Sequence, residues 1–146
     1  MTTEEDHNKM TLRSFFEAID RKDVTSLDHF VSTSFVDHNP LSMPGMASGL
    51  AGLKQAFVAF LSAFPDSTHT IEDLLADGDK VAARVVGRGT HQAAFMSAPP
   101  SGRPVTREGI AIYRFENGRI VERWGQGDRL SFMQQLVFDA GVVPLA

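Results

Sequence analysis

Two tight turns in the second half of the chain constrain its fold more than any other sequence feature. Asp77-Gly78-Asp79 and Glu116-Asn117-Gly118 each separate two extended segments that are rich in apolar residues. Asp-Gly and Asn-Gly are preferred in β-hairpin turns because these residues tolerate positive φ angles. The flanking segments predict four strands, over residues 68–76, 80–91, 105–115 and 119–126. Consecutive hairpins of this kind predict an antiparallel sheet.

The first half of the chain has a helical period instead. In its first segment the apolar positions are spaced by three, one and three residues, at Leu12, Phe15, Phe16 and Ile19, which is typical of an amphipathic helix. The expected elements outside the sheet are helices over residues 3–21, 24–31, 49–64 and 130–138, and a short strand from residue 35. Helices segregated from an antiparallel sheet predict an α+β fold. We expect a curved sheet wrapped around the N-terminal helices, with a conical pocket between them.

The composition is that of one globular domain spanning residues 1–146, with 42% hydrophobic and 22% charged residues. Lys and Arg number 14 against 18 Asp and Glu, a net charge of −4, so we expect no nucleic-acid partner. The chain has no cysteine, which excludes a disulfide framework and a thiolate nucleophile. No apolar run approaches the roughly 20 residues of a membrane span, and the acidic N-terminal segment lacks the pattern of a secretory signal. We therefore expect a cytoplasmic protein that does not bind membranes.

Several motifs carry a resemblance to a known family. The strongest is the block from Ile112 to Trp124, IYRFENGRIVERW, which continues through Asp128 to the segment at 134–136, QQL. Supporting motifs are DHNP at 37–40, FPD at 64–66, GDKV at 78–81 and GTH at 89–91. With these motifs the chain resembles the SnoaL-like polyketide cyclases, or ester cyclases, of the nuclear transport factor two-like superfamily. The resemblance covers nearly the whole chain and implies a single domain with a cystatin-like α+β barrel, and a homodimer.

The resemblance also implies a reaction. In polyketide cyclases of this family an aspartate after the last strand abstracts an acidic C–H proton, and the enolate closes a ring by intramolecular aldol addition. The matching position here is Asp128, and Arg114 stands where the family has a histidine fourteen residues earlier. Because arginine stays protonated at neutral pH, we expect Arg114, on an inward strand face, to polarise a substrate oxygen. The alternatives are a salt bridge from Arg114 to Asp128, Glu122 or Glu108, and a helix cap made by Asp128.

Five further residues are expected to contact the substrate: His38, Phe57, His91, Trp124 and Gln126. Trp124 offers a flat wall for an aromatic ligand, with an ordinary core position as the alternative. His38 could exchange protons near neutral pH or simply hold its loop in place. Alternation places Tyr113 on the strand face opposite Arg114, away from the pocket, which disfavours a tyrosine oxyanion hole like that of ketosteroid isomerase.

The sequence has neither metal-ligand spacing nor a Gly-rich phosphate loop, so we expect no metal and no cofactor. Together with the resemblance, this implies a cofactor-independent acid–base enzyme, a lyase or isomerase, that abstracts a proton next to a carbonyl of a small apolar or aromatic, polyketide-like substrate. One alternative is a polyketide hydroxylase on the same scaffold. The other is a dimeric module that binds a small ligand without catalysis.

Overall fold

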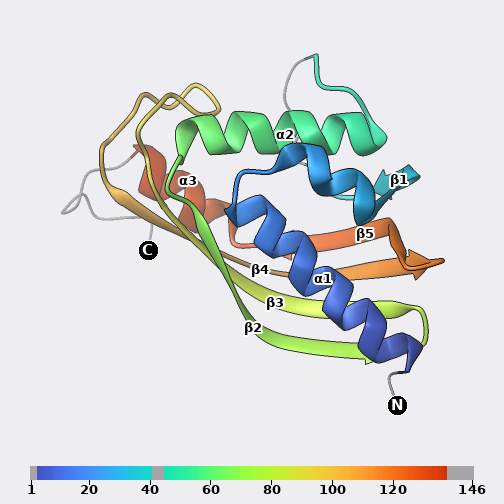
Figure 1. The fold of residues 1–146 in the computed structure, drawn as a ribbon. Helices are drawn as coiled ribbons and strands as arrows, with labels where there is room; N and C mark the ends of the chain where they lie inside the picture. The colour runs from blue at the N-terminus through green and yellow to red at the C-terminus, as the bar shows by residue number, and fades with distance from the viewer. Residues whose placement is uncertain (1–2, 41–44, 138–146) are drawn as a thin grey trace.

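The computed structural model describes residues 3–40 and 45–137. The helices are α1 (Glu4–Asp20), the 3-10 helix η1 (Val24–His29), α2 (Gly49–Ala63) and α3 (Arg129–Val137), and the strands are β1 (Val31–Asp37), β2 (Thr68–Asp77), β3 (Lys80–Thr90), β4 (Pro104–Glu116) and β5 (Arg119–Gly127). Five strands form one sheet in the order β1-β5-β4-β3-β2 (Figure 1). The α+β class is confirmed.

Local sequence signals placed most of these elements correctly. Asn117 and Gly118 adopt φ angles of 52° and 77° at the β4–β5 turn, as a type I′ hairpin requires. The first helix begins after Thr3, whose side chain accepts a hydrogen bond from the Asp6 N–H in a capping box. The last helix was expected to reach residue 138, which lies outside the described residues. All four predicted hairpin strands are present within a few residues of their expected bounds.

The first strand differs from the expectation. β1 begins at Val31 and pairs in parallel with β5, with Val31 opposite Ile120 and Asp37 opposite Arg123, so the sheet is mixed. Parallel partners are distant in sequence and leave no turn signal between them. The helix expected over 24–31 is the shorter η1, because the chain turns into β1 at Val31. The sheet ends at β1 and β2 without closing, so the expected barrel is an open, curved sheet.

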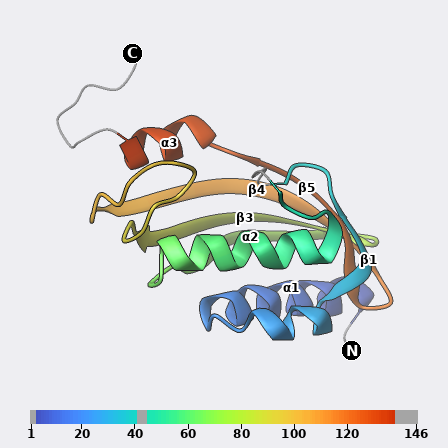
Figure 2. The ribbon, with the colours of Figure 1, turned by 90° about the horizontal axis from the view of Figure 1, so that it is seen from above.

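Both long helices cover one face of this sheet, which we call the concave face; the opposite face is the outer face (Figure 2). The first helix, α1, packs mainly on β2, and α2 packs on β1. The main core lies between them, and its largest members are Leu12, Phe15, Phe16, Leu27, Phe35, Tyr113, Phe115 and Ile120. A second core joins the end of α2, the loop after β3 and α3, around Phe60, Phe64, Phe95 and Phe132.

The faces of β4 decide where the predicted site residues lie. Tyr113 is 5% exposed on the concave face, where its ring meets Phe15 and Phe16 edge-on. Ile112 is 41% exposed on the outer face, and Arg114 shares that face by alternation. The expectation that Arg114 faces inward is therefore wrong. Both faces of β4 carry apolar residues, and the sequence does not reveal that the large aromatic side chains take the inner positions.

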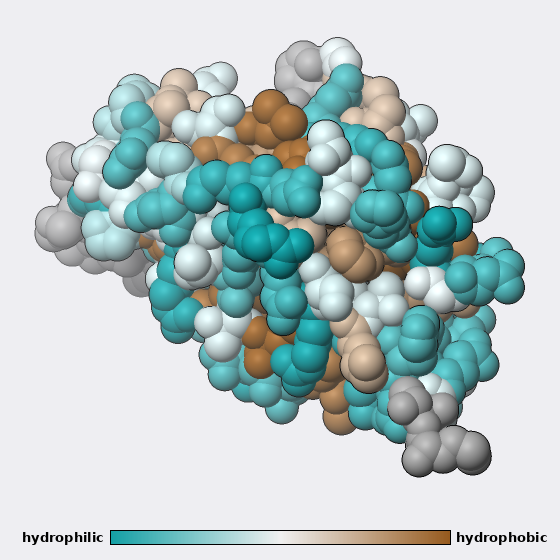
Figure 3. Space-filling view, viewed as in Figure 1, coloured by the Kyte–Doolittle hydropathy of each residue, from teal (hydrophilic) through white to brown (hydrophobic). Residues whose placement is uncertain are grey.

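Hydrophilic side chains dominate the surface on the helix-covered side, and apolar ones gather along its upper edge, over α2 (Figure 3). Val58 of α2 is 53% exposed. Within the described part of the chain, no helix has both the length and the apolar character needed to span a membrane.

Candidate functional site

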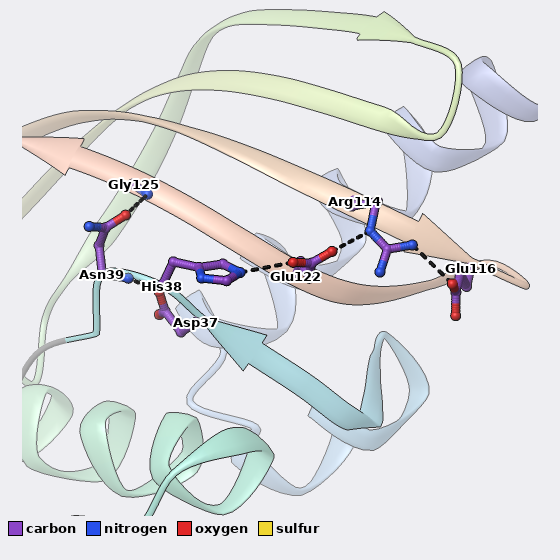
Figure 4. Close-up of polar contacts among 7 residues, drawn as sticks. All are labelled: Asp37, His38, Asn39, Arg114, Glu116, Glu122 and Gly125. Carbon is purple, nitrogen blue, oxygen red and sulfur yellow. Dashed lines mark hydrogen bonds and ion pairs between the residues drawn. The ribbon is translucent and has the colours of Figure 1, made fainter.

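One polar cluster lies on the outer face, and we call it the outer cluster: His38, Arg114, Glu116, Glu122 and Trp124. The His38 Nε2 atom lies 2.8 Å from Glu122 Oε2, and the His38 ring stacks on Trp124 with 4.9 Å between centroids. Arg114 donates to Glu122 and to Glu116 (Figure 4). Hydrogen bonds from His38 and Arg114 hold the pKa of Glu122 below its ordinary value. The outer cluster is a partly exposed ion network on the protein surface, and ion pairs of this kind contribute little to stability.

The structure brings four of the predicted site residues to this face. His38, Arg114 and Trp124 belong to the outer cluster, and Gln126 follows Trp124 on the same face of β5 and is exposed. The prediction that Trp124 and Gln126 share a face with Glu122 is confirmed by the register, in which Arg114 pairs with Glu122. The face they share is not the one that the helices enclose.

Asp128 lies apart from Arg114. Its carboxylate accepts a hydrogen bond of 2.9 Å from the Ser131 N–H and caps α3, and the side chain is exposed. The strand register carries Asp128 one residue past the last β4–β5 pair, Gly109 with Gly127, about 20 Å along the strand from Arg114 at 3.4 Å per residue. Both alternatives from the sequence, the helix cap and a salt bridge to Glu122, are thus observed. The catalytic roles of Asp128 and Arg114 stay predictions.

The two remaining predicted contacts are core residues. His91 is fully buried, stacks on Phe64 with 5.4 Å between ring centroids, and accepts a hydrogen bond from the Ser101 N–H. It therefore ties the loop after β3 to the second core. Phe57 is partly buried, packs against the main core and meets Phe15 edge-on at 6.2 Å.

A different set of polar side chains lies on the concave face, and we call it the inner polar set: Asp37, Tyr113 and Arg123. The Arg123 Nη1 atom lies 3.2 and 3.3 Å from the two Asp37 carboxylate oxygens. The Arg123 guanidinium lies over Gly125, where a Cβ atom would come within 2.6 Å of its Cζ. Asn39 holds the end of β1 against β5, because its Oδ1 accepts from the Gly125 N–H at 3.0 Å (Figure 4).

The inner polar set presents one buried and one partly exposed hydrogen-bond donor: Tyr113 is 5% exposed, and the Arg123 side chain is 29% exposed. Burial raises the pKa of Tyr113, so its phenol is a neutral O–H donor at neutral pH. Burial works against the charge on Arg123, but Tyr113 and Asp37 outweigh it and raise the Arg123 pKa. Donors of this kind stabilise a negative oxygen most strongly where a bound substrate excludes water.

A cavity of about 900 Å³ opens between β1 and α2, and Asp37 lies on its wall beside Phe35, Leu50 and Leu53. Sequence reasoning missed the inner polar set because it assigned the wrong face of β4 to the pocket. The available signal was the aromatic pair Tyr113 and Phe115 at a spacing of two residues. Across residues 3–40 and 45–137, no three acidic or His side chains gather as metal ligands would.

The sequence profile of the SnoaL-like polyketide cyclases matches residues 9–136. The chain belongs to this family. Its fold agrees with that of solved members, as three comparisons illustrate. No curated protein sequence matches the chain significantly.

IdmH, a presumed polyketide cyclase from Streptomyces antibioticus, shares 32% identity over 88% of this chain and 97% of its own, with a TM-score of 0.76. A presumed polyketide cyclase from Bacillus cereus shares 30% identity over 90% of this chain and 80% of its own, also with a TM-score of 0.76. AclR, a presumed hydroxylase from Streptomyces galilaeus, shares 25% identity over 96% of this chain and 99% of its own, with a TM-score of 0.79.

Proposed function

We propose that this protein is a cofactor-independent acid–base enzyme of the polyketide cyclase type. It abstracts a proton next to a carbonyl group of a small, apolar or aromatic substrate bound on the concave face. The observation that carries this proposal is the buried Tyr113 phenol beside the Arg123 guanidinium. Family membership supports the reaction class.

The inner polar set suits enolate formation. Asp37, on the cavity wall, is the carboxylate placed to take the proton. The electron pair of the broken C–H bond moves into the enolate, whose oxygen accepts hydrogen bonds from Tyr113 and Arg123. The enolate carbon then attacks a second carbonyl of the same molecule, which closes a ring, or regains a proton at another carbon, which isomerises the substrate. No cofactor takes part in either outcome.

Deuterium exchange at carbon tests this proposal without knowledge of the natural substrate. The probe is 2-tetralone, a bicyclic ketone with acidic C–H bonds next to its carbonyl, followed by proton NMR in D₂O. Removing one oxyanion donor typically costs about 10²–10³-fold in rate, so Tyr113→Phe should slow the enzymatic exchange by that factor. Arg114→Met, on the outer face, is the matched control and should leave exchange unchanged.

A pair of isosteric variants separates the two candidate bases. Asp37→Asn should abolish exchange, whereas Asp128→Asn should retain it, because the Asp128 carboxylate only caps α3. Circular dichroism should first confirm that each variant is folded. Exchange that survives Asp37→Asn and is lost in Asp128→Asn would overturn the proposal and restore the base that the sequence suggested.

One comparison favours a second candidate function. The similarity to AclR, a presumed hydroxylase, supports a polyketide hydroxylase on this scaffold. Hydroxylation of a C–H bond needs an oxidant, so product formation would require air and a reductant. Turnover of a polyketide substrate under strictly anaerobic conditions would exclude this candidate and leave the cyclase.

We also propose that the protein is a homodimer. The exposed Ile110 and Ile112 side chains, 54% and 41% accessible, form an apolar strip on the outer face of the sheet. The loop over 93–102 packs Phe95 and Ala98 into the second core, so these side chains do not offer an interface. The outer face is therefore the surface that we assign to the second copy.

A further inference from the structure

A second polar group lies on the concave face, away from the inner polar set. His69 of β2 pairs with Gly87 of β3, and Gly87 pairs with Arg107 of β4. His69 and Arg107 thus flank a glycine on neighbouring strands, and both side chains lie on the same face of the sheet. A Cβ at position 87 would lie 3.6 Å from His69 Nε2 and 3.8 Å from the Arg107 carbonyl oxygen. The missing side chain thus leaves room for a single carbon atom beside the His69 ring.

His69 is held by one carboxylate. Its Nδ1 lies 2.7 Å from Asp20 Oδ1, and its backbone N–H donates to Asp20 Oδ2 at 3.0 Å. The side chain is 5% exposed, and burial lowers its pKa despite the opposing effect of Asp20. In the neutral ring Nδ1–H donates to Asp20, which leaves Nε2 unprotonated. In residues 3–40 and 45–137, Nε2 finds no hydrogen-bond partner.

Arg107 is a partly buried cation without an acidic partner among the described residues. Its Cζ lies 4.3 Å from the ring centroid of Phe60 and 5.6 Å from that of Phe132. Burial lowers its pKa to about 10, and the nearby charge of Arg123 acts in the same direction. The guanidinium is still protonated at neutral pH. An unpaired buried charge is expensive for a fold to keep, so its presence favours a partner that arrives with a ligand.

We propose that Arg107 and His69 form an anion site over Gly87 that binds a carboxylate of the substrate. The inference rests on the proposed function and names its substrate class: a carbonyl compound with an apolar or aromatic body and a carboxylate. Phe60 and Phe132 beside Arg107 suit the apolar body. The charged groups that act on His69 are Asp20 from α1 and Arg107 from β4. The residue of β3 that pairs with His69 is the uncharged Gly87.

Binding of a carboxylate should protonate His69. A second negative charge beside the imidazole favours its charged form, so Nε2 takes up a proton from solvent and donates a hydrogen bond to the ligand. No bond to carbon is made or broken in this step. Affinity is then linked to proton uptake near the ordinary histidine pKa of 6.5.

Titration calorimetry with two matched probes tests the site. The probes are 2-naphthoate and its neutral isostere 2-naphthamide, each measured at pH 6.5 in buffers that differ in ionisation enthalpy. The wild type should bind the carboxylate about tenfold or more tightly than the amide, since a charge-assisted pair contributes at least this factor. Arg107→Met should remove the preference. Arg88→Met, at an exposed position of β3, should keep it.

The number of protons taken up on binding, obtained from the calorimetry in the different buffers, tests the role of His69. His69→Gln should abolish proton uptake on naphthoate binding, whereas His29→Gln, at an exposed position, should retain it. Gly87→Val should block naphthoate without any change of charge, which keeps the proposal testable if Arg107→Met does not fold. Equal affinity of the wild type for both probes, or a preference that survives Arg107→Met, would overturn the anion site.

The tests of the anion site and of the proposed function can fail separately. Naphthoate has no C–H bond next to a ketone, so its binding reports only on the anion site. Conversely, 2-tetralone has no carboxylate, so its exchange would continue if the anion site did not exist.

Discussion

Replacing Arg107 with methionine should make the free protein more stable. Burial lowers the Arg107 pKa from 12.5 to about 10, and at about 1.4 kcal/mol per pKa unit this is a penalty of about 3 kcal/mol on the charged form. Arg107 is protonated at neutral pH in both the folded and the unfolded chain, so the penalty is present in full. The lost cation–π contact with Phe60 offsets about 1 kcal/mol. The expected gain in the free energy of unfolding is therefore about 2 kcal/mol.

The assay is urea and thermal unfolding followed by circular dichroism, without ligand. For a domain of this size about 2 kcal/mol corresponds to a rise in Tm of about 4–8 °C. The matched control Arg88→Met, at an exposed position, should change the unfolding free energy by no more than about 0.5 kcal/mol. A loss of stability in Arg107→Met would refute the reasoning, because it would show that the guanidinium is well paired in the free protein.

Three further predictions concern pH, the inner polar set and assembly. The pKa of His69 in the folded protein lies below 6.5, so below about pH 6.5 the unfolded chain binds more protons than the folded one. The free energy of unfolding should therefore decrease as the pH falls below about 6.5, and it should decrease less steeply in His69→Gln. Urea unfolding at several pH values measures both slopes. Gly125→Ala should push the Arg123 guanidinium aside and slow 2-tetralone exchange while costing no more than about 1 kcal/mol of stability; unaltered exchange would contradict this. Ile112→Lys should convert the proposed dimer to monomer in analytical ultracentrifugation, whereas Val58→Lys, also at an exposed position but on α2, should not.

The hairpins and helices were predictable because their signals are local. The Asn117-Gly118 turn, the Thr3 cap and the helical spacing of Leu12 and Phe15 each act within a few residues. The parallel pairing of β1 with β5 was not predictable in this way. Its partners Val31 and Ile120 are far apart in sequence, and nothing near either residue specifies the other.

The candidate site was less predictable than the fold for the same reason. Alternation correctly separated Tyr113 from Arg114, but the choice of inner face depended on packing against Phe15 and Phe16. The proximity of His69 and Arg107 depends on the register of three strands, which a motif search along the chain does not examine. A one-residue difference in register would place either side chain on the other face.

The central claim is that ligands bind on the concave face and not at the outer cluster. The chain has one tyrosine and one tryptophan, and Tyr113 lies on the concave face while Trp124 lies on the outer face. Ring-labelled protein therefore gives one tyrosine and one tryptophan signal set in carbon–proton NMR, each reporting on one face. Titration with 2-tetralone, the probe of the inner polar set, should shift the Tyr113 ring resonances and leave those of Trp124 in place. A titration that moves Trp124 and leaves Tyr113 unchanged would contradict the account.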